Sequence, residues 1–109
     1  MINVEDYVLE FGDLRFNLVE GRIYKNGKDL AFSKAEFGIL MKLLKEYPHC
    51  VTRDELIEFT SPQKYKTNRT IDVHIYRIRN KLLEGRSNVA IATVHGKGYY
   101  LTKSNGKMR

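Results

Sequence analysis

The sequence predicts an α+β domain with an N-terminal four-stranded antiparallel sheet, three helices and a C-terminal β-hairpin. Three observations predict this fold class. Residues 7–32 alternate apolar and polar side chains between turn residues, which is typical of half-buried strands. Two Ser/Thr-x-x-Glu capping boxes then open segments with apolar residues every three or four positions. A β-branched run over 89–94 and a glycine-rich turn follow the last of the helices.

We expect four short antiparallel strands in the first part of the chain. The alternation is clearest over 13–18. Turn residues divide the segment at Gly12, at Glu20-Gly21 and at Asn26-Gly27, the last a dipeptide that favours tight hairpins. The fourth strand should end near residues 30–32.

The first capping box, Ser33-Lys34-Ala35-Glu36, predicts an amphipathic helix over 34–47 that ends before Pro48. Its predicted apolar stripe consists of Phe37, Leu40, Met41 and Leu44. The second box, Thr52-Arg53-Asp54-Glu55, predicts a shorter helix to about Phe59, anchored by Leu56, Ile57 and Phe59.

A third helix should run from residue 68 or 69 to Leu83, before Gly85. We expect a strand over 89–94, a turn over 96–98 and a strand over 99–101 after it. The predicted domain therefore covers residues 7–102. Residues 1–6 are expected to be linker or extraneous sequence, and residues 103–109 a basic, flexible tail.

Charge is distributed unevenly along the chain. Residues 1–63 contain 8 basic and 11 acidic residues, whereas residues 64–109 contain 11 basic and 2 acidic residues, a net charge of +9. This asymmetry favours a polyanionic partner for one face, either nucleic acid or an anionic membrane, although a merely solvated basic surface is an alternative.

The third helix carries most of this signal. On a helical wheel, Ile71, Ile75, Ile78 and Leu82 form a core stripe. The opposite face contains Arg69, Val73, Tyr76, Arg77 and Asn80, and it is flanked by Thr70, His74, Lys81 and Arg79. The acidic Asp72 is expected in the first turn, where the helix dipole favours it.

Arginine can donate two hydrogen bonds to phosphate or to guanine, and a branched apolar residue among arginines suits a thymine methyl group. Because a short helix precedes the longer basic one, we predict a helix-turn-helix whose second helix enters the major groove. The hairpin would then be a wing, with His95 and Lys97 near its tip directed toward the minor groove.

Residues 69–82 and 91–99 closely resemble the DNA-binding domain of OmpR/PhoB-type response regulators. The runs that carry the resemblance are RTIDVHIYRIRNKL and IATVHGKGY, with SKAEF and VTRDEL upstream. The resemblance implies a winged helix-turn-helix that binds double-stranded promoter DNA at direct repeats, as a head-to-tail pair. It also implies an upstream receiver domain and a sensor kinase. With no room here for a receiver, we expect a C-terminal effector fragment in the bacterial cytoplasm, associated with the nucleoid.

The resemblance also implies site residues. Base-reading positions correspond to Val73, Arg77 and Thr70. Phosphate-binding positions correspond to Arg69, His74, Arg79, Thr93 and Tyr99. Wing positions directed to the minor groove are His95, which replaces the usual arginine, and Lys97, which is the alternative. For the loop over 61–67, the resemblance implies a contact with RNA polymerase as one option.

Other functions find less support in the sequence. No Ser-His-Asp arrangement, zinc motif or phosphate-binding loop is recognisable. We therefore expect that the protein has no catalytic activity, binds no cofactor and holds no metal ion. Cys50 is the only cysteine, which excludes an internal disulfide. A winged helix for protein or RNA contact is the main alternative, but such a docking face would be less cationic. A membrane-surface role lacks a spare apolar face.

Overall fold

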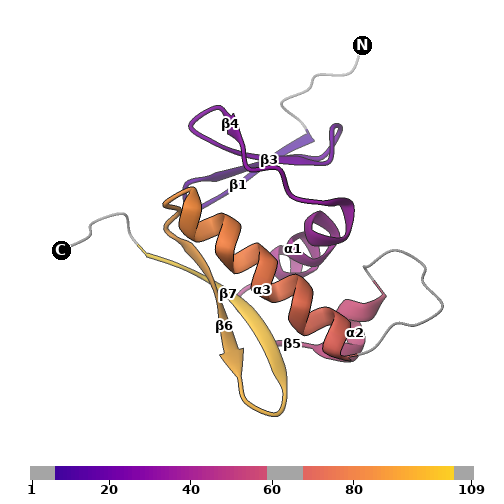
Figure 1. Cartoon of the computed structure of the whole chain (residues 1–109). Coiled ribbons are helices and arrows are strands. Elements are labelled where there is room, and N and C mark those ends of the chain that lie inside the picture. The colour runs from indigo at the N-terminus through magenta and orange to yellow at the C-terminus, as the bar shows by residue number, and fades with distance from the viewer. Residues whose placement is uncertain (1–6, 59–67, 105–109) are drawn as a thin grey trace.

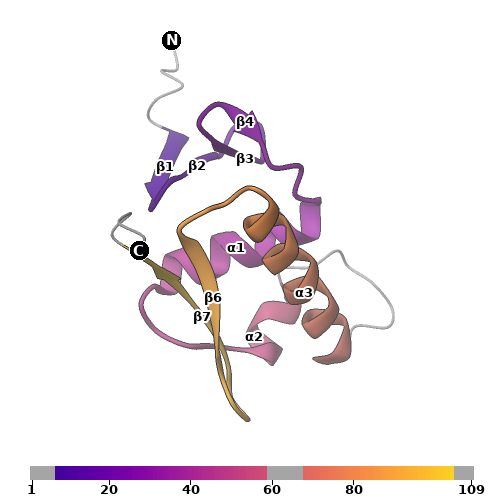
Figure 2. The same cartoon turned by 60° about the vertical axis from the view of Figure 1, so that its left-hand side comes forward.

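The computed structural model describes residues 7–58 and 68–104, with only the backbone at positions 68 and 69. Two antiparallel sheets pack against three helices (Figures 1 and 2). The four-stranded sheet lies above the helices in Figure 1, and the C-terminal hairpin projects beyond them on the other side. The predicted α+β architecture is confirmed.

The N-terminal sheet is a simple meander, because each strand is joined to the next by a tight turn. Its strands are β1 (Val8–Phe11), β2 (Leu14–Asn17), β3 (Arg22–Lys25) and β4 (Lys28–Asp29), and they pair in that order. The predicted turns are confirmed: Gly12, Gly21, Asn26 and Gly27 all have positive φ angles. Asn26 and Gly27 in succession provide the backbone that a two-residue hairpin requires.

The fourth strand is shorter than expected, since β4 ends at Asp29 rather than near residues 30–32. Ala31 has a φ of +61°, which a strand cannot accommodate. Its N–H donates to Asp29 Oδ1 at 2.8 Å. The chain therefore leaves the sheet here and turns toward the first helix.

Both predicted capping boxes are present. In α1 (Lys34–Glu46), Ser33 N–H donates to Glu36 Oε1 at 2.8 Å and Glu36 N–H donates to Ser33 Oγ at 3.2 Å. Thr52 and Glu55 make the same reciprocal pair at the start of α2. α2 (Arg53–Ile57) is shorter than expected, and Phe59 lies outside the described residues.

The buried face of α1 differs from the predicted stripe. Leu40 is fully buried as expected, but Phe37, Met41 and Leu44 are only partly buried. The fully buried positions also include Ile39 and Leu43, while the first turn buries Glu36. α1 is wrapped by β7, β5 and α3, so its buried surface is wider than a single stripe.

α3 (Asn68–Glu84) is the longest element, with the predicted core stripe. Ile71, Ile75, Ile78 and Leu82 are all at most 3% exposed. Because α3 begins at Asn68, Asp72 lies beyond the first turn, and the expected interaction of Asp72 with the helix N-terminus is wrong.

The C-terminal hairpin is part of a three-stranded sheet that the sequence did not predict. β6 (Val89–Val94) pairs with β7 (Gly98–Lys103), and β7 also pairs with the two-residue strand β5 (Val51–Thr52). Two residues are too few for a periodic pattern, which is why β5 was missed.

Gly98 belongs to β7 and not to the turn, where it was expected. A Cβ at Gly98 would lie 2.8 Å from the Val51 carbonyl carbon and 2.9 Å from Thr52 Cα. This glycine allows the β5 backbone to approach β7 closely. At the other end of β7, Lys103 pairs with Val89 and Ser104 N–H donates to the Asn88 carbonyl, so the hairpin extends beyond the predicted boundary at 102.

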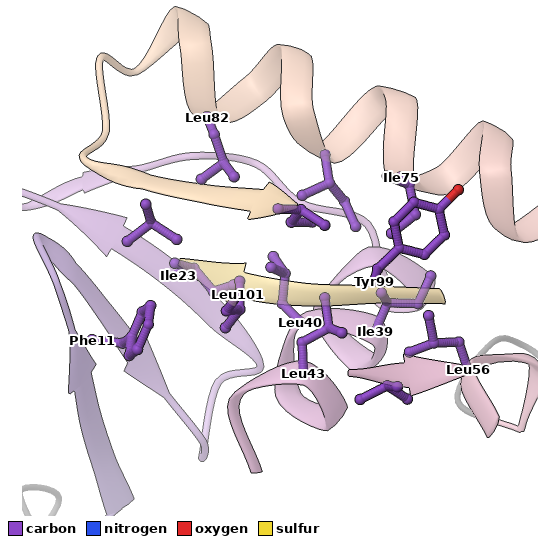
Figure 3. Close-up of a cluster of buried hydrophobic side chains, with 14 of the residues drawn as sticks. Phe11, Ile23, Ile39, Leu40, Leu43, Leu56, Ile75, Leu82, Tyr99 and Leu101 are labelled. Carbon is purple, nitrogen blue, oxygen red and sulfur yellow. The ribbon is translucent and has the colours of Figure 1, made fainter. Parts of the chain in front are cut away.

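One continuous core joins both sheets to the helices (Figure 3). A polar contact adds to it where the β1–β2 turn meets the turn before β6. Asn88 Oδ1 accepts from the Asp13 N–H at 3.0 Å, and the Asp13 carboxylate accepts from Ser87 Oγ and the Asn88 N–H. The N-terminal sheet is therefore attached to the base of the hairpin.

Candidate nucleic-acid interface

The outward face of α3 combines arginine, tyrosine and valine at exposed positions. Val73 is 40% exposed and Tyr76 65% exposed, and Arg77 is exposed as well. The Arg77 side chain makes no hydrogen bond or ion pair with any residue in the described ranges. The buried isoleucines on the opposite side determine this orientation, because burying them turns Val73 and Arg77 toward solvent. A free guanidinium beside an exposed branched side chain can contact the edges of base pairs.

Thr70 and His74 are two further predicted residues near this face on α3. Thr70 is half-buried in the first turn, and the side chain of Arg69 is outside the described part of the chain. His74 is half-buried, and its Nδ1 is buried without a hydrogen-bond partner. Burial lowers the pKa of His74, and Arg77 lowers it further, whereas Glu36 opposes the change. At neutral pH His74 is therefore an uncharged N–H donor, not a counter-ion.

The wing presents its tip to solvent. His95, Gly96 and Lys97 are all exposed, and the Lys97 N–H closes the turn on the Val94 carbonyl at 3.0 Å. Gly96 has a φ of +74°, as the predicted turn requires. Figure 1 shows β6 and β7 as a narrow two-stranded ribbon. His95 and Lys97 lie in the turn that joins these two strands.

A polar cluster joins the wing to both helices of the helix-turn-helix. Asp72 Oδ1 on α3 accepts from Arg53 Nε on α2 at 2.8 Å and from Tyr99 Oη on β7 at 2.6 Å. Tyr99 is only 5% exposed, and Figure 3 shows its hydroxyl directed toward α3. Tyr99 thus links β7 to α3.

The pKa shifts within this cluster agree with its hydrogen bonds. Burial raises the pKa of Tyr99, and the hydrogen bond to Asp72 raises it further, so the phenol stays protonated and donates. Burial alone would raise the pKa of Asp72, but the hydrogen bonds from Tyr99 and Arg53 outweigh it and lower that pKa. Asp72 is therefore a carboxylate at neutral pH.

Arg79 and Thr93 lie on the flank of α3 that faces the wing. Arg79 Nη2 donates to the Ile91 carbonyl and to Thr93 Oγ1, both at 2.8 Å. Its guanidinium also lies 5.5 Å from the centroid of the Tyr99 ring. The donors of Arg79 are thus engaged within the protein, and its predicted phosphate contact stays a prediction, as do those of Thr93 and Tyr99.

An ion pair between the half-buried Lys81 and the buried Glu36 links the C-terminal part of α3 to α1. Lys81 Nζ donates to Glu36 Oε1 at 2.7 Å and to the Ala31 carbonyl at 2.8 Å. Burial alone would raise the pKa of Glu36, but the hydrogen bonds from Lys81 and the Ser33 N–H lower it overall. Lys81 thus lies on the flank of α3, but its ammonium group is engaged with α1 and the Ala31 carbonyl.

Arg53, Asp72 and Glu36 are the residues of this surface that sequence reasoning missed. Nothing in their local pattern marks them, because each bond joins residues at least 19 positions apart. The one available signal was a charged residue near an apolar stripe, which is common on any amphipathic helix.

The described residues hold no group of three or more His, Cys, Asp or Glu side chains that could bind a metal ion. None of the helices within 7–58 and 68–104 is long and apolar enough to cross a bilayer. The predicted RNA polymerase contact at 61–67 lies outside the described residues.

Known proteins resemble this chain over most of its length. The family described as "Transcriptional regulatory protein, C terminal" matches residues 27–101. The heme response regulator HssR of Staphylococcus epidermidis is 37% identical over 95 residues, which cover 86% of this chain and 42% of HssR. The chain therefore spans less than half the length of that relative.

Solved structures share the fold. The DNA-binding domain of RstA from Klebsiella pneumoniae, in complex with the RstA box, has a TM-score of 0.72 and 31% identity over 87% of this chain and 96% of that one. The DNA-binding domain of the response regulator AdeR, in complex with an intercistronic region, reaches 0.79 at 22% identity, covering 88% of this chain and 100% of that one. The second likeness concerns the fold alone.

Proposed function

The chain belongs to the family of C-terminal domains of transcriptional regulatory proteins, the DNA-binding effector domains of OmpR/PhoB-type response regulators, and we propose that it recognises specific duplex sequences with α3 in the major groove and the β6–β7 wing toward the minor groove. This family is one of DNA-binding regulators and not a class of enzymes.

The observation that carries the proposal is the composition of the outward face of α3. Arg77 is exposed and has no partner among the described residues, and Val73 lies one helical turn before it. A side chain held in an internal ion pair must break that pair before it can read a base, whereas Arg77 is available. In a groove, Arg77 would donate to guanine and Val73 would contact a thymine methyl group.

The other predicted residues are assigned to base, phosphate or minor-groove contacts. Thr70, the third predicted base-reading residue, lies one turn before Val73 and two turns before Arg77 on the same helix. Phosphate contacts position the protein on the duplex, and we assign them to Arg69, His74, Arg79 and Thr93. The resemblance implies a phosphate contact for Tyr99 as well, but its hydroxyl already donates to Asp72. His95 and Lys97 at the wing tip would enter the minor groove, where negative potential attracts basic side chains.

For the complete protein, we propose an upstream receiver domain controlled by a sensor kinase. HssR, which is named a heme response regulator, is more than twice as long as the matching part of this chain. Two copies would bind direct repeats head-to-tail, and residues 61–67 would approach RNA polymerase. A protein that binds promoters in this way acts on the bacterial nucleoid, in the cytoplasm.

Selection from a random duplex pool tests the proposal. The 109-residue chain is expected to enrich one sequence, and enrichment of paired half-sites would support the head-to-tail arrangement. Affinity for the selected duplex should fall steeply with salt, by a slope of about 0.9 per phosphate contact. No enrichment, or an affinity that does not change between low and high KCl, would falsify the proposal.

A further inference from the structure

Tyr99 connects the wing to α3, as Arg79 also does through Ile91 and Thr93. Tyr99 is the second residue of β7, and it pairs with Thr93 on β6 and with Val51 on β5. Its hydroxyl donates to Asp72 on α3. Tyr99 therefore lies where the hairpin begins to project from the domain, and there it contacts α3.

Two guanidinium groups hold the ring of Tyr99 in place. Arg53 lies 5.4 Å and Arg79 5.5 Å from the ring centroid, within the range of cation–π attraction. Arg53 also binds the carboxylate that accepts from the tyrosine, and Arg79 binds the Ile91 carbonyl on β6. Four elements, α2, α3, β6 and β7, thus meet around a single ring.

A direct phosphate contact by this hydroxyl is unfavourable in the observed geometry. Tyr99 is 5% exposed, and its only hydroxyl proton is already donated to a carboxylate at 2.6 Å. A phosphate would have to displace Asp72 and approach a second negative charge. At the tip, in contrast, His95 and Lys97 are exposed.

We propose that Tyr99 is a positioning residue, which Asp72 and Arg79 hold so that the wing keeps a set direction relative to α3. The helix and the wing can then reach neighbouring grooves without an ordering cost at binding. This inference rests on the proposed function, because the direction of the wing matters only if the tip contacts DNA.

A double-mutant cycle tests the proposal. The first change is Tyr99→Phe, which removes one hydroxyl, and the second is His95→Ala with Lys97→Ala, which removes the basic tip. Affinity is measured by fluorescence anisotropy with a labelled duplex that the wild-type chain has selected from a random pool. All variants are compared at a temperature at which thermal unfolding shows each of them to be folded.

If Tyr99 positions the wing, Tyr99→Phe weakens binding on the order of fivefold by misdirecting the tip. The tip substitutions then cost about tenfold in the wild-type background but only about twofold in the Tyr99→Phe background. Asp72→Asn retains an oxygen that can accept from the Tyr99 hydroxyl. The loss of affinity in Asp72→Asn should therefore be smaller than that in Tyr99→Phe.

Tyr100→Phe is the matched control. Tyr100 follows Tyr99 in β7 and points to the other face of the sheet, and its hydroxyl bonds to no described residue. Removing the Tyr100 hydroxyl should change neither the affinity for the duplex nor the loss of affinity that the tip substitutions cause.

Three results would overturn the inference. If the losses of affinity from Tyr99→Phe and from the tip substitutions simply add, Tyr99 contacts DNA by itself. If Tyr99→Phe leaves the affinity unchanged, its hydroxyl has a purely structural role, and if the tip substitutions leave it unchanged, the wing does not contribute to binding. Failure of the proposed function is distinguishable from all three, because the wild-type chain would then select no duplex.

Discussion

The outward face of α3 and the flank of α3 that faces the wing use the same residue type in different ways. Arg77 is exposed and makes no hydrogen bond within the described residues, whereas Arg79, two positions later, donates to the Ile91 carbonyl and Thr93 Oγ1. The difference comes from the 100° rotation per residue, which directs one guanidinium to solvent and the other to β6. A side chain that reads a ligand has to be free, and a side chain that shapes the reading surface has to be paired.

The largest expected effect concerns the inner side of the same helix. Leu82 is 3% exposed and Leu83 is 75% exposed, although they are neighbours of the same type. Leu82→Ala should lower the free energy of unfolding by about 3 kcal/mol, because it leaves a cavity in the core. Leu83→Ala should change it by no more than about 0.5 kcal/mol. Urea denaturation of both variants measures the contrast, and similar losses would contradict the assigned orientation of α3.

The ion pair between Lys81 and the buried Glu36 is expected to have the next largest effect. Lys81→Met leaves the Glu36 carboxylate buried without its cation, so it should destabilise the domain by about 2–3 kcal/mol. Adding Glu36→Gln removes the unpaired charge and should recover most of the loss. Urea denaturation of the single and double variants measures this rescue, and a double variant less stable than Lys81→Met would exclude it.

The same pair predicts a dependence of stability on pH. The pKa of Glu36 is lowered in the folded state, because the hydrogen bonds from Lys81 and Ser33 outweigh the opposing effect of burial. Its contribution is therefore complete above the ordinary glutamate range, about pH 4, and is lost as the pH falls through the folded-state value. The stability difference between the wild type and Glu36→Gln should narrow in acid, as thermal unfolding at several pH values would show.

Arg77 provides the sharpest test of the outward face. Arg77→Ala should weaken binding to the selected duplex by about 1–3 kcal/mol and binding to a random duplex much less. Lys97→Ala should weaken both, since its contact with DNA is mainly electrostatic. Fluorescence anisotropy on the two duplexes separates these patterns. An equal loss for Arg77→Ala on both would mean that its charge, and not base reading, is what matters.

Val73 is expected to have the smallest effect. Replacing thymine by uracil within the selected half-site removes one methyl group, and the loss at the contacted position should be about 1 kcal/mol, the scale of one buried carbon. In Val73→Ala this discrimination should disappear, because the shorter side chain no longer reaches the groove floor. A loss that persists in the variant would assign the thymine contact to another residue.

Much of the fold could be predicted because its signals are local. Both capping boxes lie within four residues of sequence, and the Asn26-Gly27 turn lies within two. The core stripe of α3 is periodic over three turns, so its buried face was also correctly predicted. β5 and the true extent of β7 were missed, since a two-residue strand exists only through its partner.

The candidate site was predictable only in part, for the same reason. The exposure of Val73 and Arg77 follows from helical periodicity, and the exposed wing tip follows from its glycines. The inward turn of Lys81 and the pairing of Asp72 could not be inferred, because Glu36 and Tyr99 are distant in sequence. Helical position shows which side of α3 a residue lies on, but not what another element places there.

The sequence by itself determined the order of the longer elements, the caps of α1 and α2 and the apolar side of α3, since these depend on interactions among near neighbours. Only the tertiary structure decided which charged groups remain free for DNA. The bonds of Arg79, Lys81 and Asp72 form between elements that the core has first brought together. Whether a charge contacts a ligand or its own fold thus depends on packing over long distances along the chain.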